Sequence, residues 1–400
     1  MEKKRGVLLA GVGLSAIFLI LPALADAARG VGKDEVVLGF IGDLSGPTVV
    51  VQKPYLDAVK NYFRYVNEKG GINGRKIKLI PEDDQYQPPK AVAALKKLVT
   101  RDEVLAVVGP TGSGPLKACY SMIESEKVPC IGPMSTTDDM LDPFKRYIFT
   151  IMSTYHDQVR VIFDYIIKDL QGQKPKVVLV TQQNEPGKVV EAATRETAKA
   201  KGVELADVVY LLQGATDATS QVLLLKKADP NYVIIQGDIG VAVAVLKDAK
   251  KLGFDCKSIG TFSVFSEKTY LAAQDAAAKF VGVHSINAWY DEGPAIEEMR
   301  QVTLKYEPGT EATVRDRYYV QGWAAGTIVA EGLKRAGKDL DSEKLVGALE
   351  GIKGLDMKGL CGPISYSPKS HKGLEHVRVY GWDFGKKRLI PLTDWLKPSR

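Results

Sequence analysis

Histidine is scarce in this sequence, and the residue patterns of common catalytic sites are missing. The 400 residues include four histidines, none of which belongs to a metal-binding motif. We find no Gly-x-Ser-x-Gly nucleophile elbow and no P-loop. The acidic pairs at residues 83–84 and 138–139 resemble acid–base pairs, but adjacent carboxylates in loops usually contact solvent or cap helices. The sequence therefore does not predict an enzyme, and it predicts neither a metal site nor a cofactor.

A large excess of charge of one sign is also missing. Lysine and arginine number 54, against 48 aspartates and glutamates, which gives a formal net charge of +6. Beyond the N-terminal segment, the basic residues do not gather into a run. Proteins that bind nucleic acid usually carry a basic patch or stripe. We therefore expect no nucleic-acid partner.

Only one long apolar run occurs, at residues 7–21, directly after a short basic segment. It is shorter than the roughly 20 residues that a membrane-spanning helix needs, and small residues follow it. This pattern predicts a signal peptide over residues 1–25, cleaved after Ala25 or, as a second choice, after Ala27. An uncleaved N-terminal anchor is the alternative. No cysteine stands at the cleavage site, so a lipid anchor is not indicated.

The four cysteines permit two interpretations. An even number in an exported protein is compatible with two disulfides, which we place between Cys119 and Cys130 and between Cys256 and Cys361. Four buried free thiols are the alternative, because sequence spacing does not show which Cα atoms lie within bonding distance.

Short apolar strands alternate with amphipathic helices along the chain. One series of strands is expected at residues 36–41, 76–80, 104–108 and 128–131, and a second at 177–181, 205–210, 232–235, 259–262 and 280–286. Such alternation is typical of parallel sheets with helices on both faces. About 370 residues remain after processing, which is more than one core usually organises. We therefore predict two doubly wound α/β lobes with a ligand cleft at the strand ends.

Two turns rich in glycine and hydroxyl groups follow successive strands of the first series. Residues 109–114 (Gly-Pro-Thr-Gly-Ser-Gly) open a helix and place backbone N–H groups and the Ser113 hydroxyl where an anion can bind. Residues 132–137 (Gly-Pro-Met-Ser-Thr-Thr) repeat the arrangement. Each turn alone is also explained by helix capping. Together, at neighbouring strand ends, they predict one shared anion site.

Three stretches of the chain resemble the periplasmic leucine/isoleucine/valine-binding family, the type I solute-binding proteins of ATP-driven importers. They are residues 39–47 (Gly-Phe-Ile-Gly-Asp-Leu-Ser-Gly-Pro), 66–75 (Val-Asn-Glu-Lys-Gly-Gly-Ile-Asn-Gly-Arg) and 82–88 (Glu-Asp-Asp-Gln-Tyr-Gln-Pro). The resemblance implies a periplasmic protein that captures a small molecule and passes it to the membrane permease of an ABC transporter. We expect it to act as a monomer.

The resemblance also implies how the lobes are built. Three crossovers would join them, near residues 149–153, 284–287 and 357–363. The first lobe would then comprise residues 34–150 and 286–358, and the second lobe residues 151–285 and 359–400.

The ligand-binding turns of the family have counterparts in this chain. In the family, a ligand carboxylate is held by the turn that contains Gly112 and Ser113 here, and by the turn that contains Met134, Ser135 and Thr136. Because the serine and the threonine are present, the resemblance implies a small-molecule ligand that carries a carboxylate.

The positions that hold a ligand ammonium in the family differ here. The family glutamate corresponds to Phe262, and two pocket tyrosines correspond to Pro186 and Val51. Asp238 is a candidate replacement, because an ammonium shielded from water needs a nearby carboxylate; a helix N-cap is the alternative role for Asp238. An aromatic or short-chain acid therefore competes with an aliphatic amino acid as the ligand. The candidates for an apolar wall are Val51, Phe262, Tyr290 and Tyr319.

Two other functions remain as alternatives. A sensor that reports its ligand to a membrane receptor uses the same two lobes, and the sequence does not separate it from a transporter component. An α/β enzyme is less favoured, because no catalytic constellation stands out.

Overall fold

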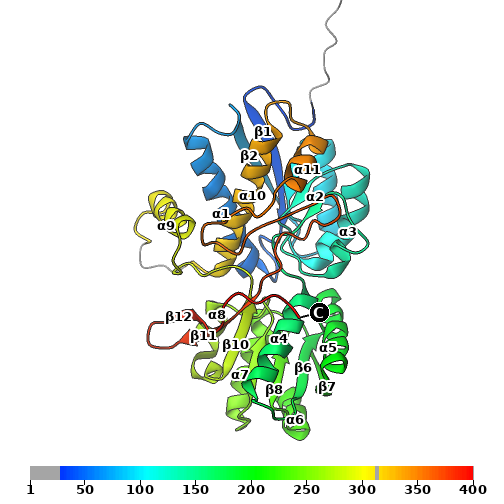
Figure 1. The fold of residues 1–400 in the computed structure, drawn as a ribbon, viewed down its shortest axis with the longest axis vertical. Coiled ribbons are helices and arrows are strands. Elements are labelled where there is room, and N and C mark those ends of the chain that lie inside the picture. The colour runs from blue at the N-terminus through cyan, green and yellow to red at the C-terminus, as the bar shows by residue number, and fades with distance from the viewer. Residues whose placement is uncertain (1–27, 311–314, 400) are drawn as a thin grey trace, which may run out of the picture.

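The computed structural model describes residues 28–310 and 315–399. The predicted signal peptide and both candidate cleavage sites lie outside the described residues. The described chain forms two α/β lobes, one above the other in Figure 1, which confirms the predicted fold class. None of the described helices combines the length and hydropathy that a bilayer-spanning segment needs.

The first lobe contains a parallel five-stranded sheet in the order β2-β1-β3-β4-β5. Its strands are β1 (Glu35–Gly42), β2 (Lys76–Asp83), β3 (Ala106–Val108), β4 (Cys130–Ile131) and β5 (Ile148–Phe149). The helices between them are α1 (Val49–Glu68), α2 (Pro88–Thr100) and α3 (Ser113–Ser125), with the short 3-10 helix η1 (Asp138–Met140). Strands β3 and β4 are fully buried, and β1 is buried over Leu38–Gly42, as expected of a parallel sheet covered on both faces.

The second lobe contains a seven-stranded sheet in the order β12-β11-β10-β9-β8-β6-β7, in which the pairs β10–β11 and β11–β12 are antiparallel and the other pairs are parallel. Its strands are β6 (Lys176–Gln182), β7 (Glu204–Leu211), β8 (Tyr232–Ile235), β9 (Lys257–Gly260), β10 (Phe280–His284), β11 (Arg378–Asp383) and β12 (Arg388–Pro391). The helices are α4 (Tyr155–Asp169), α5 (Glu185–Lys201), α6 (Thr219–Ala228), α7 (Ile239–Lys251), α8 (Glu267–Ala273) and the 3-10 helix η2 (Gln274–Ala277).

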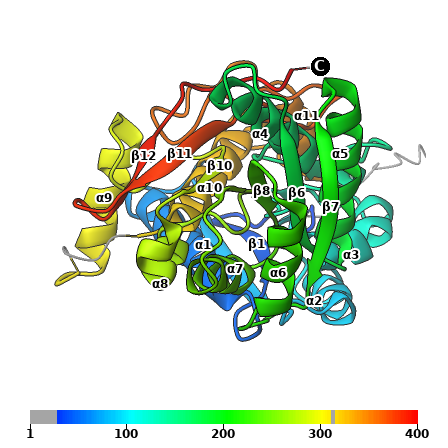
Figure 2. The same cartoon turned by 90° about the horizontal axis from the view of Figure 1, so that it is seen from below.

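Alternation along β6 explains why this sheet is covered on both faces. Val177 and Leu179 join the core on the side of α4 and α5, whereas Val178 and Val180 join a separate core with α6 and α7. Successive side chains of a strand point to opposite faces, so four adjacent apolar residues supply both cores. Figure 2 shows these helix pairs on either side of the strands.

A later part of the chain returns to the first lobe. Helices α9 (Pro294–Tyr306) and α10 (Arg317–Ala336) lie beside α1 in Figure 1, and α11 (Ser342–Glu350) packs on α10. Helix α10 packs closely along α1 at Gly322, where an added Cβ would lie 2.2 Å from the carbonyl oxygen of Tyr55. A side chain at this position would therefore push the two helices apart.

Three segments connect the lobes. The first two, after β5 and after β10, contact each other through the hydroxyls of Ser153 and Ser285, whose oxygens are 2.6 Å apart. The third segment continues along the first lobe beyond residues 358/359, where we placed the boundary between the lobes from the sequence. Tyr366 donates to the carbonyl oxygen of Thr150 at 3.0 Å, and residues 150 and 372 form a β-bridge. The chain joins the second sheet only at β11.

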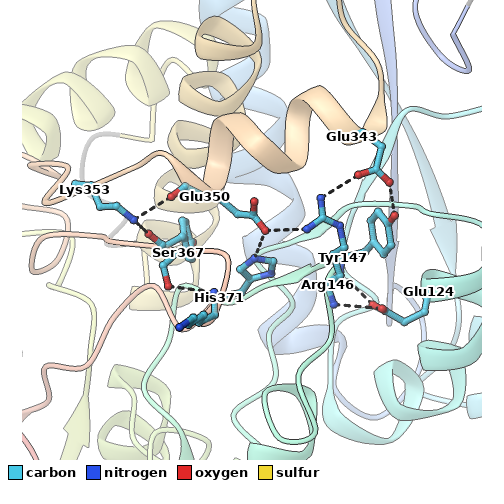
Figure 3. A network of polar contacts seen from close by, with 10 residues as sticks. Glu124, Arg146, Tyr147, Glu343, Glu350, Lys353, Ser367 and His371 are labelled. Atoms are coloured by element: carbon cyan, nitrogen blue, oxygen red, sulfur yellow. Dashed lines mark hydrogen bonds and ion pairs between the residues drawn. The ribbon is translucent and has the colours of Figure 1, made fainter.

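A polar network holds this third segment on the first lobe (Figure 3). The Arg146 guanidinium lies 3.0 Å from Glu343 and 3.3 Å from Glu350 in α11, and His371 Nε2 lies 3.2 Å from the same Glu350 oxygen. The His371 ring stacks on Phe149 with centroids 3.7 Å apart. Burial lowers the pKa of His371, so the ring is neutral at pH 7. Residues in and next to β5 therefore contact both α11 and the third segment.

All four cysteines are free thiols, so the structure contains neither of the two predicted disulfides. Cys130 Sγ instead donates to the carbonyl oxygen of Gly109 at 2.6 Å, and Cys256 Sγ lies 3.3 Å from that of Pro230. Cys119, Cys130 and Cys361 are buried. The alternative interpretation, thiols that act as small apolar side chains, therefore describes this chain.

Candidate functional site

A cavity of about 150 Å³ lies between the two lobes. Its walls come from the loops and first helical turns that follow the carboxyl ends of the strands, which is where open α/β sheets bind ligands. The first lobe contributes the starts of α1 and α3, and the second lobe contributes the starts of α5 and α7.

The two hydroxyl-bearing turns of the first lobe meet at this cavity. Gly112 N–H donates to the carbonyl oxygen of Met134 at 3.1 Å, and the hydroxyls of Ser113 and Ser135 are 3.0 Å apart. Gly112 has φ +94°, and an added Cβ would lie 2.3 Å from the ring of Tyr86, so the position requires glycine. Gly112, Ser113 and Met134 all line the cavity. The convergence that the sequence predicted is therefore present in the structure.

Ser113 is the first residue of α3 and does not cap it. Gly112 is the N-cap residue and offers no side-chain acceptor, so the first-turn N–H groups of α3 have no partner within the helix. The Ser113 hydroxyl and these N–H groups are donors at the positive end of the helix dipole. An anion in the cavity would be stabilised by both.

Ser135 and Thr136 lie behind the cavity wall rather than on it. Both are buried, and neither contributes to the lining. The Thr136 carbonyl oxygen accepts from Tyr155 N–H at 2.7 Å, and the Tyr155 side chain does line the cavity. Burial raises the pKa of Tyr155, while nearby hydroxyl and amide groups of Thr136, Ser263 and Gln236 partly oppose this shift. Thr136 therefore supports Tyr155.

Asp238 lines the second-lobe side of the cavity and also caps α7. Its Oδ1 accepts from Val241 N–H at 3.0 Å, and its Oδ2 accepts from the Gln182 amide at 2.9 Å and from Gly214 N–H at 3.2 Å. Gln182 in turn accepts from the Asn184 amide at 3.1 Å. The capping role weighed from the sequence is thus present, together with a place in the cavity wall.

The apolar wall contains some of the expected residues and several that sequence reasoning missed. Val51 and Phe262 line the cavity, whereas Tyr290 and Tyr319 do not. The Tyr319 hydroxyl is instead 2.8 Å from that of Thr303. The lining residues not anticipated include Gln52, Tyr86, Tyr155, Gln236 and Tyr318. Apart from Tyr318, which lies at the start of α10, these residues lie in a loop or a first helical turn after a strand or crossover.

Buried hydrogen bonds fix the start of α1 at the cavity. Gln52 Oε1 accepts from the N–H of Asp43 at 2.6 Å and also from the Thr111 hydroxyl. The Gln52 amide nitrogen donates to the Thr48 hydroxyl at 2.9 Å, and that hydroxyl donates to Asp43 at 2.7 Å. The glutamine therefore links β1, α1 and the turn after β3, which holds this part of the wall in place.

The lobes touch each other on two sides of the cavity. Lys117 in α3 pairs with Glu185 in α5 at 2.7 Å, and Lys268 in α8 pairs with Asp316, the N-cap of α10, at 2.7 Å. Lys268 also donates to the carbonyl oxygen of Val50. In Figure 1, α3 and α5 lie at the right and α8 and α10 lie to their left, so the lobes contact each other at two separate places beside the cavity.

Two α/β lobes that close over a small cavity walled by helix starts define a two-lobed solute-binding protein. The sequence matches the model of the periplasmic binding protein family over residues 35–387, so the chain belongs to this family. The resemblance inferred from the sequence is thereby confirmed.

Relatives and solved structures agree with this assignment. The chain is similar to the leucine-, isoleucine-, valine-, threonine- and alanine-binding protein of Pseudomonas aeruginosa, with 23% identity over 354 residues, 86% of this chain and 92% of that protein. An amino acid binding protein of the same organism is 25% identical over 98% of this chain and 100% of its own length.

Among solved structures, a branched chain amino acid ABC transporter protein from Thermus thermophilus with bound valine superposes with a TM-score of 0.85 at 25% identity, covering 92% of this chain and 97% of that one. A fatty acid ABC transporter substrate-binding protein from Thermomonospora curvata has the same fold, with a TM-score of 0.82 at 23% identity, covering 92% and 94%.

Proposed function

We propose that the protein captures a small organic carboxylate between its lobes and delivers it to the membrane permease of an ABC importer. The observation that carries this proposal is the Ser113 hydroxyl on the cavity wall at the start of α3, beside the Gly112 turn. A carboxylate placed there accepts hydrogen bonds from the hydroxyl and from first-turn N–H groups. The relatives that carry names of amino acid binding proteins and transporter components support the same role.

We propose further that the protein is exported to the periplasm, acts as a monomer and releases its ligand chemically unchanged. The lining offers no arrangement of nucleophile and general base: the cavity has one charged residue, Asp238, and its oxygens already accept three N–H donors.

Ligand binding and release would follow from opening and closing of the lobes about the three connecting segments. Of the two ion pairs that join the lobes, Lys117 with Glu185 is exposed and therefore weak in water, whereas the carboxylate of Asp316 is buried. Opening of the lobes breaks both pairs, and a ligand that bridges the lobes favours the closed state.

A thermal-shift screen of the mature protein against amino acids, aromatic acids, short fatty acids and amides tests the proposal. A ligand at a hundredfold excess over its Kd stabilises the folded state by about 2.7 kcal/mol. We expect a carboxylate to give the largest shift and to reduce the radius of gyration in solution scattering. A profile that stays unchanged at saturation contradicts closure, and conversion of more ligand than protein present contradicts the binding role.

A further inference from the structure

Six helices begin at the cavity wall, and two of them have no side-chain cap. Residues in their first or second turns line the cavity: Val51 (α1), Ser113 (α3), Tyr155 (α4), Pro186 (α5), Ile239 (α7) and Tyr318 (α10). Side chains cap α4, α5, α7 and α10, the last two through the carboxylates of Asp238 and Asp316. Helices α1 and α3 have no such cap, so their first-turn N–H groups lack acceptors in the helix and carry partial positive charge. The first lobe therefore directs the positive ends of α1 and α3 toward the ligand, which favours an anion at this wall.

The cavity has no carboxylate free to oppose this positive charge. Asp238 is the one acidic residue among the described lining residues, and three N–H donors occupy its two oxygens. A carboxylate has about four acceptor positions, so most of its capacity is used. The neighbouring Gln182 Oε1 is also occupied, by the Asn184 amide.

An ammonium group would therefore lose its water without gaining a dedicated partner. A charge removed from water is strongly destabilised unless it is paired and hydrogen-bonded. By contrast, Val51 and Met134 of the first lobe and Phe262 of the second lobe offer apolar surface, and Tyr155 and Gln236 offer neutral donors. These groups suit an uncharged part of a ligand.

The size of the cavity limits that uncharged part. A volume of about 150 Å³ is similar to that of engineered apolar cavities that hold benzene. The lining thus accommodates one ring or a short branched chain next to the carboxylate.

We propose that the ligand class is a monocarboxylic acid with a compact apolar body and no ammonium group, such as an aromatic or a branched short-chain acid. This inference rests on the proposed function, because it takes the carboxylate site at Ser113 as given. The proposed ligand class differs from that of the relatives whose names state that they bind amino acids.

Calorimetric titration with matched ligands tests the proposal. Each set shares one body: 3-phenylpropanoate, phenylalanine and 3-phenylpropanamide form one set, and 4-methylpentanoate, leucine and 4-methylpentanamide the other. We expect the acid of at least one set to bind about tenfold or more tightly than its amino acid, and more tightly than its amide. An amino acid that binds more tightly than its acid overturns the inference and leaves the proposed function intact. An amide that matches its acid, or a protein that binds no member of either set, removes the carboxylate site and both proposals with it.

A substitution that restores the missing charge provides a second test. Phe262 lines the cavity, and its backbone N–H is anchored by Gln158 Oε1 at 3.1 Å, so its side chain can be exchanged at a fixed position. In Phe262→Glu we expect the ratio of amino-acid to acid affinity to rise about tenfold or more, because a carboxylate then opposes the helix dipoles. The neutral variant Phe262→Gln is the matched control and should not raise the ratio. A folded Phe262→Glu protein with an unchanged ratio contradicts the inference.

A third test, Asp238→Asn, removes a carboxylate from the cavity wall instead of adding one. Because Asp238 lines the cavity, Asp238→Asn can change the affinity for both ligands; if Asp238 serves only as a cap and wall residue, the ratio of amino-acid to acid affinity stays within about threefold, less than one hydrogen bond to a charged group is worth. Selective loss of amino-acid binding in this variant identifies Asp238 as an ammonium partner and overturns the proposal.

Discussion

Lys117 Nζ in α3 lies 2.7 Å from Glu185 Oε2, at the first residue of α5, so an ion pair joins the two lobes directly beside the ligand cavity. Both residues that flank Glu185, Asn184 and Pro186, line the cavity. Lys117 also lies 3.6 Å from Asp139 in its own lobe. The lysine therefore has an acidic neighbour in the open state and gains a second one when the lobes close.

Removing this ion pair should weaken ligand binding slightly through its effect on closure. The side chains are 49% and 40% exposed, so solvent screening limits the pair to a few tenths of a kcal/mol up to about 1 kcal/mol. For Lys117→Met we expect affinity to fall by about 1.5- to fivefold at low salt, and the difference to disappear near 1 M salt. Calorimetry at two salt concentrations measures both effects. A loss that persists unchanged at high salt would point to a direct contact with the ligand instead.

Substitution of Ser113 tests the anion site itself. A hydrogen bond to a charged group is worth about 1.5 to 3 kcal/mol, so Ser113→Ala should weaken binding by roughly tenfold to more than a hundredfold. Because Ser113 does not cap α3, its loss should change thermal stability little. Wild-type affinity in Ser113→Ala shows that the carboxylate binds elsewhere.

Thr136→Val serves as the comparison, since Thr136 lies behind the wall and reaches the cavity only through Tyr155. We expect a smaller loss of affinity than in Ser113→Ala. From the sequence we expected both hydroxyls to bind the carboxylate, whereas in the structure only Ser113 lines the cavity. Equal losses in the two variants, measured by calorimetry, contradict this ranking.

The fold was predictable because the chain's local patterns agree with its topology. The apolar run Val177 to Val180 fits only a strand covered on both faces, and it lies at the centre of the second lobe. The glycine-rich turn at residues 109–114 was expected to open a helix, and in the structure α3 begins at Ser113. Such features are local, so sequence reasoning reaches them.

The details that failed depend on contacts between distant parts of the chain. Tyr319 contacts Thr303 and does not line the cavity. Gln52 was missed because its importance comes from Asp43 and Thr111, which no periodicity reveals. A side chain's partner across the fold is set by packing, and one sequence without its structure does not contain that information.

The cysteines predict how the protein responds to reducing agents. Burial raises the pKa of Cys119 and of Cys256 to about 12, so their thiolate forms are rare at neutral pH. We expect Tm to stay unchanged on addition of dithiothreitol. A thiol reagent should react slowly with the native protein and with four thiols after unfolding, in agreement with four free cysteines. A count of two or none in the unfolded, unreduced protein would show that disulfides form after all.

The buried carboxyl group of Glu267 should make stability depend on pH. Its side chain lies at the interface of the lobes, where Oε1 accepts from the Tyr290 hydroxyl at 3.3 Å and Oε2 has no hydrogen-bond partner among the described residues. Burial raises the pKa of Glu267 to about 7, and the positive charge of Arg317 only partly opposes this shift. The guanidinium of Arg317 is itself buried and packs on the ring of Tyr380, 4.3 Å from its centroid.

The sign of the effect follows from the raised pKa. Between the unfolded value of 4.5 and the folded value of about 7, the folded protein binds more protons than the unfolded chain, so the free energy of unfolding falls as pH rises. A shift of this size corresponds to at most about 3 kcal/mol, present below pH 4.5 and lost above pH 7. Glu267→Gln removes this titration, while Asp84, whose pKa burial also raises to about 7, titrates equally in both proteins and cancels. Urea unfolding of both proteins from pH 4 to 8 should therefore show the variant gaining stability relative to the wild type as pH rises. A difference independent of pH contradicts a buried, protonated Glu267.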